Sequence, residues 1–553
     1  MKRELLIVFL CVSLTGTVLR GQTLEKGIWY LQQKQYISAK RTFESLLHIN
    51  PANAKALYYL GQSYYALNKL DSADYCFQQG MLADPKEPYN YLGAGKILLN
   101  KADKVNWFKM YDKGRKLSND VFTYNLEAAD ACLSSTTKNY DLAAKYLDEA
   151  QLDNDKDPKV YIGYGNLYLL SKSPGDAINS YQRAIYYDKN CVEAYLKLGE
   201  IYTKANYFKD GLNAFNTALE IDSLQIIGYK MRGDMFYNVA KYQEAEKDYT
   251  IYMQRSDRTL EEQEKYVFIL FFAKDYERAM ALIDLLLQSN PELTILYRIK
   301  AYIDYETGKY PEGQENLETF FEKHDTSRFI ALDYVYYGRL LIKSKQDSLG
   351  TIQLVKALVM DSSKVELYDD LARSYSRQKK FQQSNDAYKK MLVTDPANQQ
   401  NIFYQIGRNY YFMAEDTLAG YDSLQRISYY NQADSNFKLV TELSPESYVG
   451  FIWRGRVHSR LDPETSIGLA KPDYEQALAI IEKGDASKTP KLLIECYRYL
   501  AFYYYLEADK LKPTEPEQAQ FNMDNSINYW EKILALDPAD AQAMTALENL
   551  KAN

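Results

Sequence analysis

The sequence has little of what most enzymes use for chemistry. Only three of its 553 residues are histidines, and they stand far apart, at His48, His324 and His458. No two of them have the spacing of metal ligands on one helix, and neither a GxSxG nucleophile motif nor a phosphate-binding P-loop is present. We therefore expect neither an enzyme nor a cofactor.

Cysteine is also scarce. The five cysteines are widely and irregularly spaced, at Cys11, Cys76, Cys132, Cys191 and Cys496. This spacing predicts no disulfide framework and no zinc site, and the last four are expected to be buried free thiols.

Basic residues show no excess over acidic ones. The formal net charge is −7 and the pI is about 5.4. A dedicated nucleic-acid binder would carry a basic face, so we expect no nucleic-acid partner. After the N-terminal segment no apolar run is long enough for a bilayer span, so no membrane span is expected once that segment is removed.

The N-terminal segment, residues 1–21, has the layout of a secretory signal peptide. A basic start is followed by an apolar run from Leu5 to Leu14, and the small Gly21 precedes Gln22. A lipoprotein interpretation at Cys11 is disfavoured, because bulky Phe9 and Leu10 precede that cysteine. The style of this segment predicts an exported bacterial protein of the periplasm or the outer-membrane periphery.

Tyrosine is abundant, with 53 residues, and it recurs in a repeat. LYYLGQSYYALNKLDSADYCFQQGMLADP (Leu57–Pro85) and YLKLGEIYTKANYFKDGLNAFNTALEIDS (Tyr195–Ser223) share their small and aromatic positions. The period of about 34 residues is that of a two-helix repeat. A small residue of the first helix recurs at Gly27, Gly61, Gly95, Gly165, Gly199, Gly233, Ala301, Gly338, Ala372, Gly407, Gly455 and Ala501.

This pattern resembles the tetratricopeptide repeat (TPR) family over nearly all of the chain after residue 21. The resemblance implies an all-α fold: a right-handed superhelical solenoid of about fourteen helix-turn-helix repeats. We expect the array over residues 22–538 and a C-terminal capping helix over 539–553. The repeats are weaker over about 99–157, where Trp107 takes a usually small position, and insertions are expected at about 415–428 and 510–520.

Packing explains the recurring positions. Two helices that pack at about 8–10 Å need small residues where they cross. Tyr and Phe are expected to fill the wider gaps beside the crossing, so most tyrosines should belong to the core. His458 stands where other repeats carry Tyr, and we interpret it as a packed histidine.

A row of arginines follows the small residue in four consecutive repeats, in the strings GRLL, ARSY, GRNY and GRVH. The resemblance implies that first-helix positions line a concave groove that holds partner peptides. At about 10 Å per repeat the row would span roughly 30 Å. The row and its expected neighbours are Arg339, Arg373, Arg408 and Arg456, flanked by Arg298 and Arg498, with Tyr404 and Tyr411 on the same surface.

Two interpretations of this row stay open. Arginine holds carboxylates through two parallel hydrogen bonds, so the row would bind an acidic segment or a C-terminal carboxylate of a partner. Alternatively, each arginine pairs inside the array, for instance with Glu366 or Asp369, as surface charges commonly do.

The sequence thus predicts a non-catalytic protein–protein interaction scaffold or adaptor of the cell envelope. Its partners would be proteins or peptides, such as envelope assembly, transport or secretion components. The alternative function is glycan or small-ligand binding through a tyrosine-lined concave face.

Overall fold

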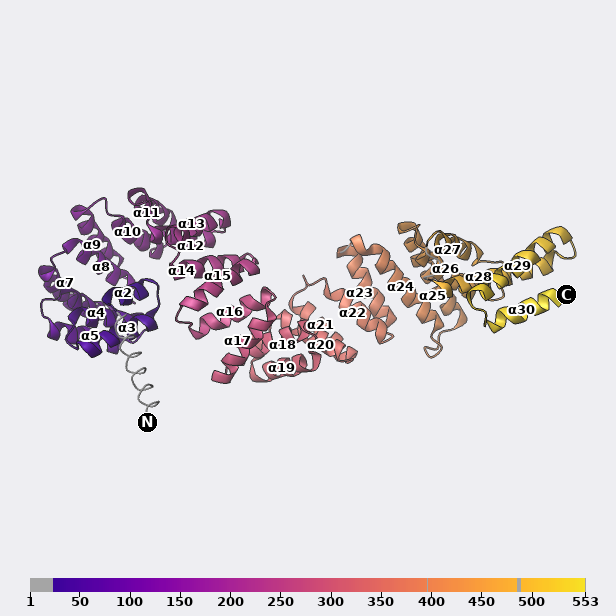
Figure 1. Cartoon of the computed structure of the whole chain (residues 1–553), viewed down its shortest axis with the longest axis horizontal. Coiled ribbons are helices and arrows are strands. Elements are labelled where there is room, and N and C mark those ends of the chain that lie inside the picture. The colour runs from indigo at the N-terminus through magenta and orange to yellow at the C-terminus, as the bar shows by residue number, and fades with distance from the viewer. Residues whose placement is uncertain (1–22, 395, 485–488, 553) are drawn as a thin grey trace, which may run out of the picture. The chain divides into compact units, whose positions relative to one another are not determined.

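The computed structural model describes residues 23–394, 396–484 and 489–552 (Figure 1). The predicted signal peptide, residues 1–21, lies outside the described residues. The described chain contains the helices α2 to α30 and two short 3-10 helices, η1 (Thr326–Arg328) and η2 (Pro396–Asn398), and no strand. The chain divides into two compact units, Met1–Pro291 and Glu292–Asn553.

The first unit is a stack of eight antiparallel helix pairs. Its helices are α2 (Leu24–Gln32), α3 (Tyr36–Ile49), α4 (Ala54–Ala66), α5 (Leu70–Ala83), α6 (Pro88–Asn100), α7 (Lys104–Leu117), α8 (Val121–Ser134), α9 (Tyr140–Asp153), α10 (Pro158–Leu170), α11 (Pro174–Tyr187), α12 (Val192–Lys204), α13 (Phe208–Ile221), α14 (Ile226–Asn238), α15 (Tyr242–Arg255), α16 (Leu260–Phe272) and α17 (Tyr276–Ser289).

The second unit contains six helix pairs and a final single helix. Its helices are α18 (Leu296–Glu306), α19 (Tyr310–Lys323), α20 (Ala331–Lys343), α21 (Asp347–Met360), α22 (Leu367–Arg377), α23 (Phe381–Thr394), α24 (Gln399–Glu415), α25 (Ser423–Leu443), α26 (Tyr448–Leu461), α27 (Lys471–Lys483), α28 (Pro490–Leu511), α29 (Pro516–Leu536) and α30 (Ala541–Ala552). The predicted all-helical solenoid of about fourteen pairs with a terminal helix is confirmed. In the described part of the chain, no helix combines the length and apolar character that a bilayer crossing requires.

Aromatic rings of the second helices lie directly against glycines of the first helices. A Cβ atom added to Gly61 would lie 2.4 Å from the ring of Phe77, and one added to Gly165 would lie 2.4 Å from the ring of Tyr181. The small residue is therefore needed because the ring occupies the space of its side chain, not only because the helices cross there. The rings were expected beside the crossing, and the structure corrects that detail.

Most tyrosines are buried or half-buried in this packing, as the repeat pattern predicts. Of the 53, all of which fall within the described residues, only Tyr75, Tyr186, Tyr207 and Tyr505 are exposed.

In the weak repeats near residue 100 the helices are kept, but a different side chain packs against the glycine of the first helix. Gly95 packs against Trp107, whose ring carbons would lie 2.7 Å and 2.9 Å from an added Cβ. Trp107 is fully buried, and its indole N–H donates to the hydroxyl of Tyr146 at 3.3 Å. A large ring one helical turn earlier thus replaces the usual aromatic residue.

The two expected insertions each contain a short loop and also lengthen the helices on either side of it. Only Asp416–Asp422 and Lys512–Glu515 lie outside helices in these two stretches. Helix α25 begins at Ser423 because Asp422 and Gln425 form a reciprocal capping box at its first turn. Helix α29 begins at Pro516, in the first turn, where proline is tolerated.

The first repeat of unit 1 is capped by residues of the seventh. Helix α3 receives no cap from its own N-cap side chain; instead, Asp257 accepts the backbone N–H groups of Ile37 at 2.8 Å and Ser38 at 3.1 Å. In return, the side-chain oxygen of Gln33 accepts the N–H of Ile226, the first residue of α14, at 2.8 Å. Figure 1 shows α2 beside α14. Seven repeats therefore bring unit 1 back onto its own beginning.

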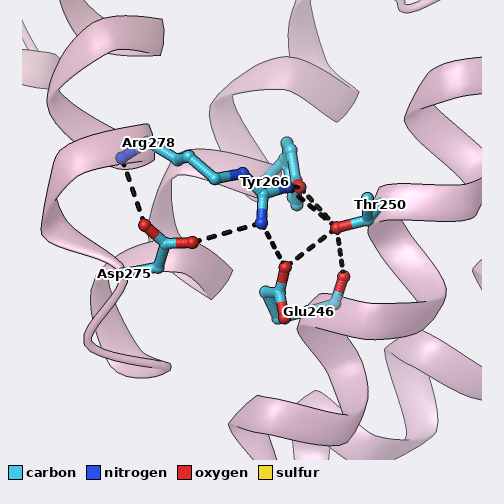
Figure 2. A network of polar contacts seen from close by, with 5 residues as sticks. All are labelled: Glu246, Thr250, Tyr266, Asp275 and Arg278. Carbon is cyan, nitrogen blue, oxygen red and sulfur yellow. Dashed lines mark hydrogen bonds and ion pairs between the residues drawn. The ribbon is translucent and has the colours of Figure 1, made fainter.

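A polar network joins the last two repeats of this unit (Figure 2). Arg278 of α17 donates to Thr250 of α15 at 2.9 Å and pairs with Asp275 at 3.1 Å, and it also reaches Glu246 and the hydroxyl of Tyr266. Helix α16 carries Tyr266 but lacks the small residue that first helices have in the other repeats. The polar contacts of Arg278 therefore join α15, α16 and α17 where the usual packing of a ring against a glycine is missing.

Candidate binding surface

The predicted arginine row lies entirely in unit 2, on the first helices of four consecutive repeats. Arg339 is on α20, Arg373 on α22, Arg408 on α24 and Arg456 on α26. Each follows a buried small residue, so the repeat places all four at the same position of the helix pair. Arg373 is exposed, and the other three are half-buried.

Two arginines of the row pair with carboxylates of the following repeat. Arg339 donates to Asp370 of α22 at 2.8 Å. Arg456 holds Glu495 of α28 with two hydrogen bonds, of 2.8 Å and 2.7 Å. The hydrogen bonds to Glu495 raise the pKa of Arg456, so this pair stabilises the charged guanidinium.

Arg373 pairs within its own helix. It donates to Asp369, one turn earlier, at 2.9 Å, and Asp369 is one of the two partners considered from the sequence. An exposed pair of this kind contributes about 0–1 kcal/mol, so a competing carboxylate can displace Asp369 at little cost.

The flanking arginines are structural. Arg298 is buried and holds Asp333 with bonds of 2.7 Å and 2.8 Å; Asp333 in turn accepts the N–H of Ile330 at the start of α20. Arg498 pairs at 2.5 Å with Asp540, which caps the terminal helix α30. Each side chain joins neighbouring helices, and the expectation that both widen the binding stripe stays a prediction.

Arg408 differs from every other arginine of the row. Among residues 23–394, 396–484 and 489–552, no carboxylate lies within ion-pair distance of it, and its one polar partner is Gln405, at 3.2 Å. Its guanidinium carbon lies 5.6 Å from the ring centres of Tyr404 and Phe412 and 5.8 Å from that of Trp453. Its Nε is buried and has no hydrogen-bond partner in the described chain.

The aromatic residues around Arg408 form one cluster, which we call the Arg408 cage: Tyr404, Phe412 and Trp453. Trp453 also lies 4.7 Å from Arg456, so the cage joins two arginines of the row. Attraction to ring faces stabilises a cation by about 0.5–2 kcal/mol, which partly offsets the missing counter-charge of Arg408.

The two predicted tyrosines take different places. Tyr404 belongs to the cage, and its ring meets that of Trp453 edge-on at 6.1 Å. Tyr411 packs edge-on against Trp453 at 5.4 Å and supports the cage from the side. Both tyrosines are half-buried, which leaves less of their ring faces for stacking on a sugar than the sequence suggested.

Phe412 and Trp453 were missed in the sequence. Phe412 stands four residues after Arg408, and Trp453 stands three before Arg456, so both spacings place them one helical turn from a row arginine. A search for aromatic residues at these spacings would have found them. Phe412 is the most exposed ring of the cage, at 37%.

The described residues contain no group of three or more His, Cys, Asp or Glu that could hold a metal ion. The predicted packed histidine, His458, is buried between Asp434 and Asp473, and the four later cysteines are buried free thiols, as expected.

Comparison with known proteins agrees with the repeat architecture. Two tetratricopeptide repeat models match residues 30–94 and 192–223. The C-terminal part of a TPR repeat-containing protein from Cytophaga hutchinsonii is 30% identical, over 51% of this chain and 98% of that chain, with a TM-score of 0.40. A tetratricopeptide repeat protein from Parabacteroides merdae is 18% identical, over 46% and 98% of the two chains, with a TM-score of 0.30. No curated protein matches the chain.

The family models match stretches that the structure shows as helix pairs, and the Cytophaga relative is 30% identical over 98% of its own length. The chain belongs to the tetratricopeptide repeat family.

Proposed function

We propose that this protein is a non-catalytic adaptor that binds an acidic segment of a partner protein at the Arg408 cage. Tetratricopeptide repeats generally mediate protein–protein interaction, and proteins built from them are generally not catalysts. The observation that carries the proposal is the state of Arg408: the rest of the row has carboxylate partners, whereas Arg408 has none in the described chain.

The chemistry of the site favours a carboxylate. A guanidinium offers five N–H donors, and Gln405 accepts only one of those of Arg408. A partner carboxylate would supply the missing counter-charge and accept two parallel hydrogen bonds. The ring of Phe412 provides an apolar surface for a neighbouring side chain of the same segment.

The contact that we propose is shorter than the predicted arginine row. A row of four arginines suggested a contact of about nine extended residues. Because Arg339 and Arg456 already hold carboxylates, the contact we propose centres on Arg408. Arg373 is its neighbour in the preceding repeat, and its weak pair with Asp369 can open.

The proposed setting is the bacterial cell envelope. The layout of residues 1–21 supports export to the periplasm or the outer-membrane periphery, where the partner would be an assembly, transport or secretion component. N-terminal sequencing of the protein from a periplasmic fraction tests this: a chain that begins near Gln22 supports it, and an uncleaved chain in the cytoplasmic fraction contradicts it.

Binding can be tested with a defined probe. A fluorescein-labelled nine-residue peptide of alternating glutamate and leucine is titrated with the protein, and fluorescence anisotropy is measured. We expect Arg408→Glu to weaken binding at least tenfold, about 1.4 kcal/mol. Arg183→Glu is the matched control, because Arg183 is an exposed arginine that lies 4.7 Å from the ring of Tyr161 in unit 1.

Two results would contradict the proposal. Equal affinity of Arg408→Glu and wild type would show that the cage does not hold the acidic peptide. Binding that is unchanged by salt, and equally strong for a glutamine version of the peptide, would favour the alternative of ring stacking over charge.

A further inference from the structure

A hollow in unit 1, which we call the α7 hollow, lies between the turn that joins α5 to α6 and the helices α6 and α7. Its volume is about 420 Å³, within the usual range of about 300–1,000 Å³ for small-molecule sites. Pro85 of the turn, Tyr91 of α6 and Leu117 of α7 form its apolar wall. Tyr91 is buried, and its hydroxyl donates to the carbonyl oxygen of Pro85 at 3.0 Å, which holds the ring in place. The hollow therefore offers a fixed apolar wall to a small ligand.

The charged part of the α7 hollow comes from one face of α7. Four exposed charged side chains, at spacings that place them on one side of the helix, line the hollow: Lys109, Asp112, Lys113 and Lys116. Three lysines and one aspartate give the hollow a net charge of +2. Asp84 and Lys86, which are exposed in the same turn as Pro85, carry opposite charges and leave this balance unchanged.

Among the residues that the structure describes, none of the three lysines has a carboxylate within ion-pair distance. Lys109 donates to the side-chain oxygen of Asn106 at 3.2 Å, and the ammonium of Lys113 lies 4.6 Å from the ring centre of Tyr91. Asp112 stands four residues before Lys116, a spacing that gives ion pairs elsewhere in unit 1, but these two side chains form none. The α7 hollow therefore collects positive charge that the described chain does not neutralise.

The repeat itself does not require these lysines. They are the sixth, tenth and thirteenth residues of α7, and no other second helix of 14 residues in the described chain carries Lys or Arg at all three positions. The dipole of α7 favours cations in its last turn, which holds Lys116, but this effect falls off before Lys109. Helix packing and the helix dipole therefore do not account for the cluster, and its position around a hollow indicates an anionic ligand.

We propose that the α7 hollow binds a phosphate monoester, with the three lysines around the phosphate group and the organic part of the ester against Tyr91, Pro85 and Leu117. A phosphate monoester carries a charge of about −1.5 to −2 at pH 7, close to the charge that the hollow leaves uncompensated. Each ammonium group can donate to a different phosphate oxygen, and Asp112 opposes any further negative charge. A carboxylate or a sulfate ester carries a single negative charge and would compensate only half of the net charge. A soluble ester and a lipid headgroup such as phosphatidic acid present the same group, so the experiment separates these two sources.

Binding is measured by phosphorus NMR of phenyl phosphate titrated with the purified protein. We expect a saturable change of the phosphate signal, and at least about tenfold weaker binding for Lys113→Gln, which removes one charge-assisted hydrogen bond. Lys189→Gln is the matched control and should bind like wild type, because Lys189 is an exposed lysine of unit 1 that lies 5.9 Å from the ring centre of Tyr186. Asp112→Asn should bind more tightly than wild type, a gain that damage to the fold would not produce. Circular dichroism verifies that the variants keep their helices.

Vesicles separate the two sources of the phosphate group. The protein is sedimented with phosphatidylcholine vesicles that contain or lack phosphatidic acid. Capture by phosphatidic acid that Lys113→Gln abolishes, without a signal change for phenyl phosphate, assigns the hollow to a lipid headgroup. Binding of phenyl phosphate without capture by vesicles assigns it to a soluble ester. The proposal is overturned if neither probe binds, if Lys113→Gln binds like wild type, or if phenyl sulfate binds as tightly as phenyl phosphate.

Discussion

Raising the pH should destabilise unit 2 through His458. The imidazole is buried in α26, with Nδ1 2.6 Å from Asp473 and Nε2 3.1 Å from Asp434, and Arg454 contacts the same two carboxylates. Burial alone would lower the pKa of His458, but the hydrogen bonds to Asp434 and Asp473 outweigh it and raise the pKa to about 9. The charged form of the histidine therefore stabilises the folded state.

The direction and the magnitude of this pH effect follow from the linkage between protonation of His458 and folding. In the unfolded chain the histidine has its ordinary pKa of 6.5, so the stabilisation is fully present below pH 6.5 and is lost as the pH rises through about 9. A shift of about 2.5 pH units corresponds to about 3 kcal/mol at most. Arg454 stays charged over this range, so it keeps the two carboxylates partly compensated when His458 is neutral, and the loss should be nearer to about 2 kcal/mol.

Urea unfolding from pH 6 to 10, followed by tryptophan fluorescence, measures this loss, since Trp453 lies on the same helix as His458. His458→Gln is the control, because glutamine retains hydrogen-bonding capacity but does not titrate. We expect the unfolding midpoint of wild type to fall towards that of His458→Gln between pH 7 and 9.5. Parallel pH profiles for the two proteins would refute the reasoning.

Two further predictions concern unit 1. Asp257→Ala should remove the distant cap of α3 and cost about 0.5–2 kcal/mol, seen as faster hydrogen exchange of the α3 amides; unchanged exchange there would contradict the capping role. Gly165→Ala should lower the thermal midpoint by overpacking against Tyr181, at about 1–3 kcal/mol, whereas Gly175→Ala, with no atom within 4 Å of its added Cβ, should not lower it. Equal midpoints for the two variants would contradict the account of glycine packing.

The fold could be predicted because its determinants are local. Gly61 and Phe77 lie within one repeat, so the same spacing recurs along the chain and identifies each helix pair. Trp107 shows where prediction from the repeat pattern fails. It occupies a position where a small residue is expected, and only the structure shows that its ring fills the space next to Gly95. The long helix α25 was missed because a polar stretch with a capping box looks like a loop insertion until its hydrogen bonds are seen.

The candidate site could be predicted only in part. The repeat fixed the positions of the arginines, but two of their partners come from the next repeat: Asp370 is 31 residues from Arg339, and Glu495 is 39 residues from Arg456. Such spacings vary with insertions, so the sequence could not tell occupied arginines from an available one. In the structure, Arg408 is the member of the row without a carboxylate partner among the described residues, which is why the proposal centres on it.

A charge exchange tests the central claim most directly. The alternating glutamate–leucine peptide and a matching lysine–leucine peptide are each titrated with wild type and with Arg408→Glu in the same buffer. If Arg408 contacts a partner carboxylate, the variant should lose affinity for the glutamate peptide and gain affinity for the lysine peptide. If both proteins prefer the glutamate peptide to the same degree, acidic segments bind elsewhere and the proposed site is wrong.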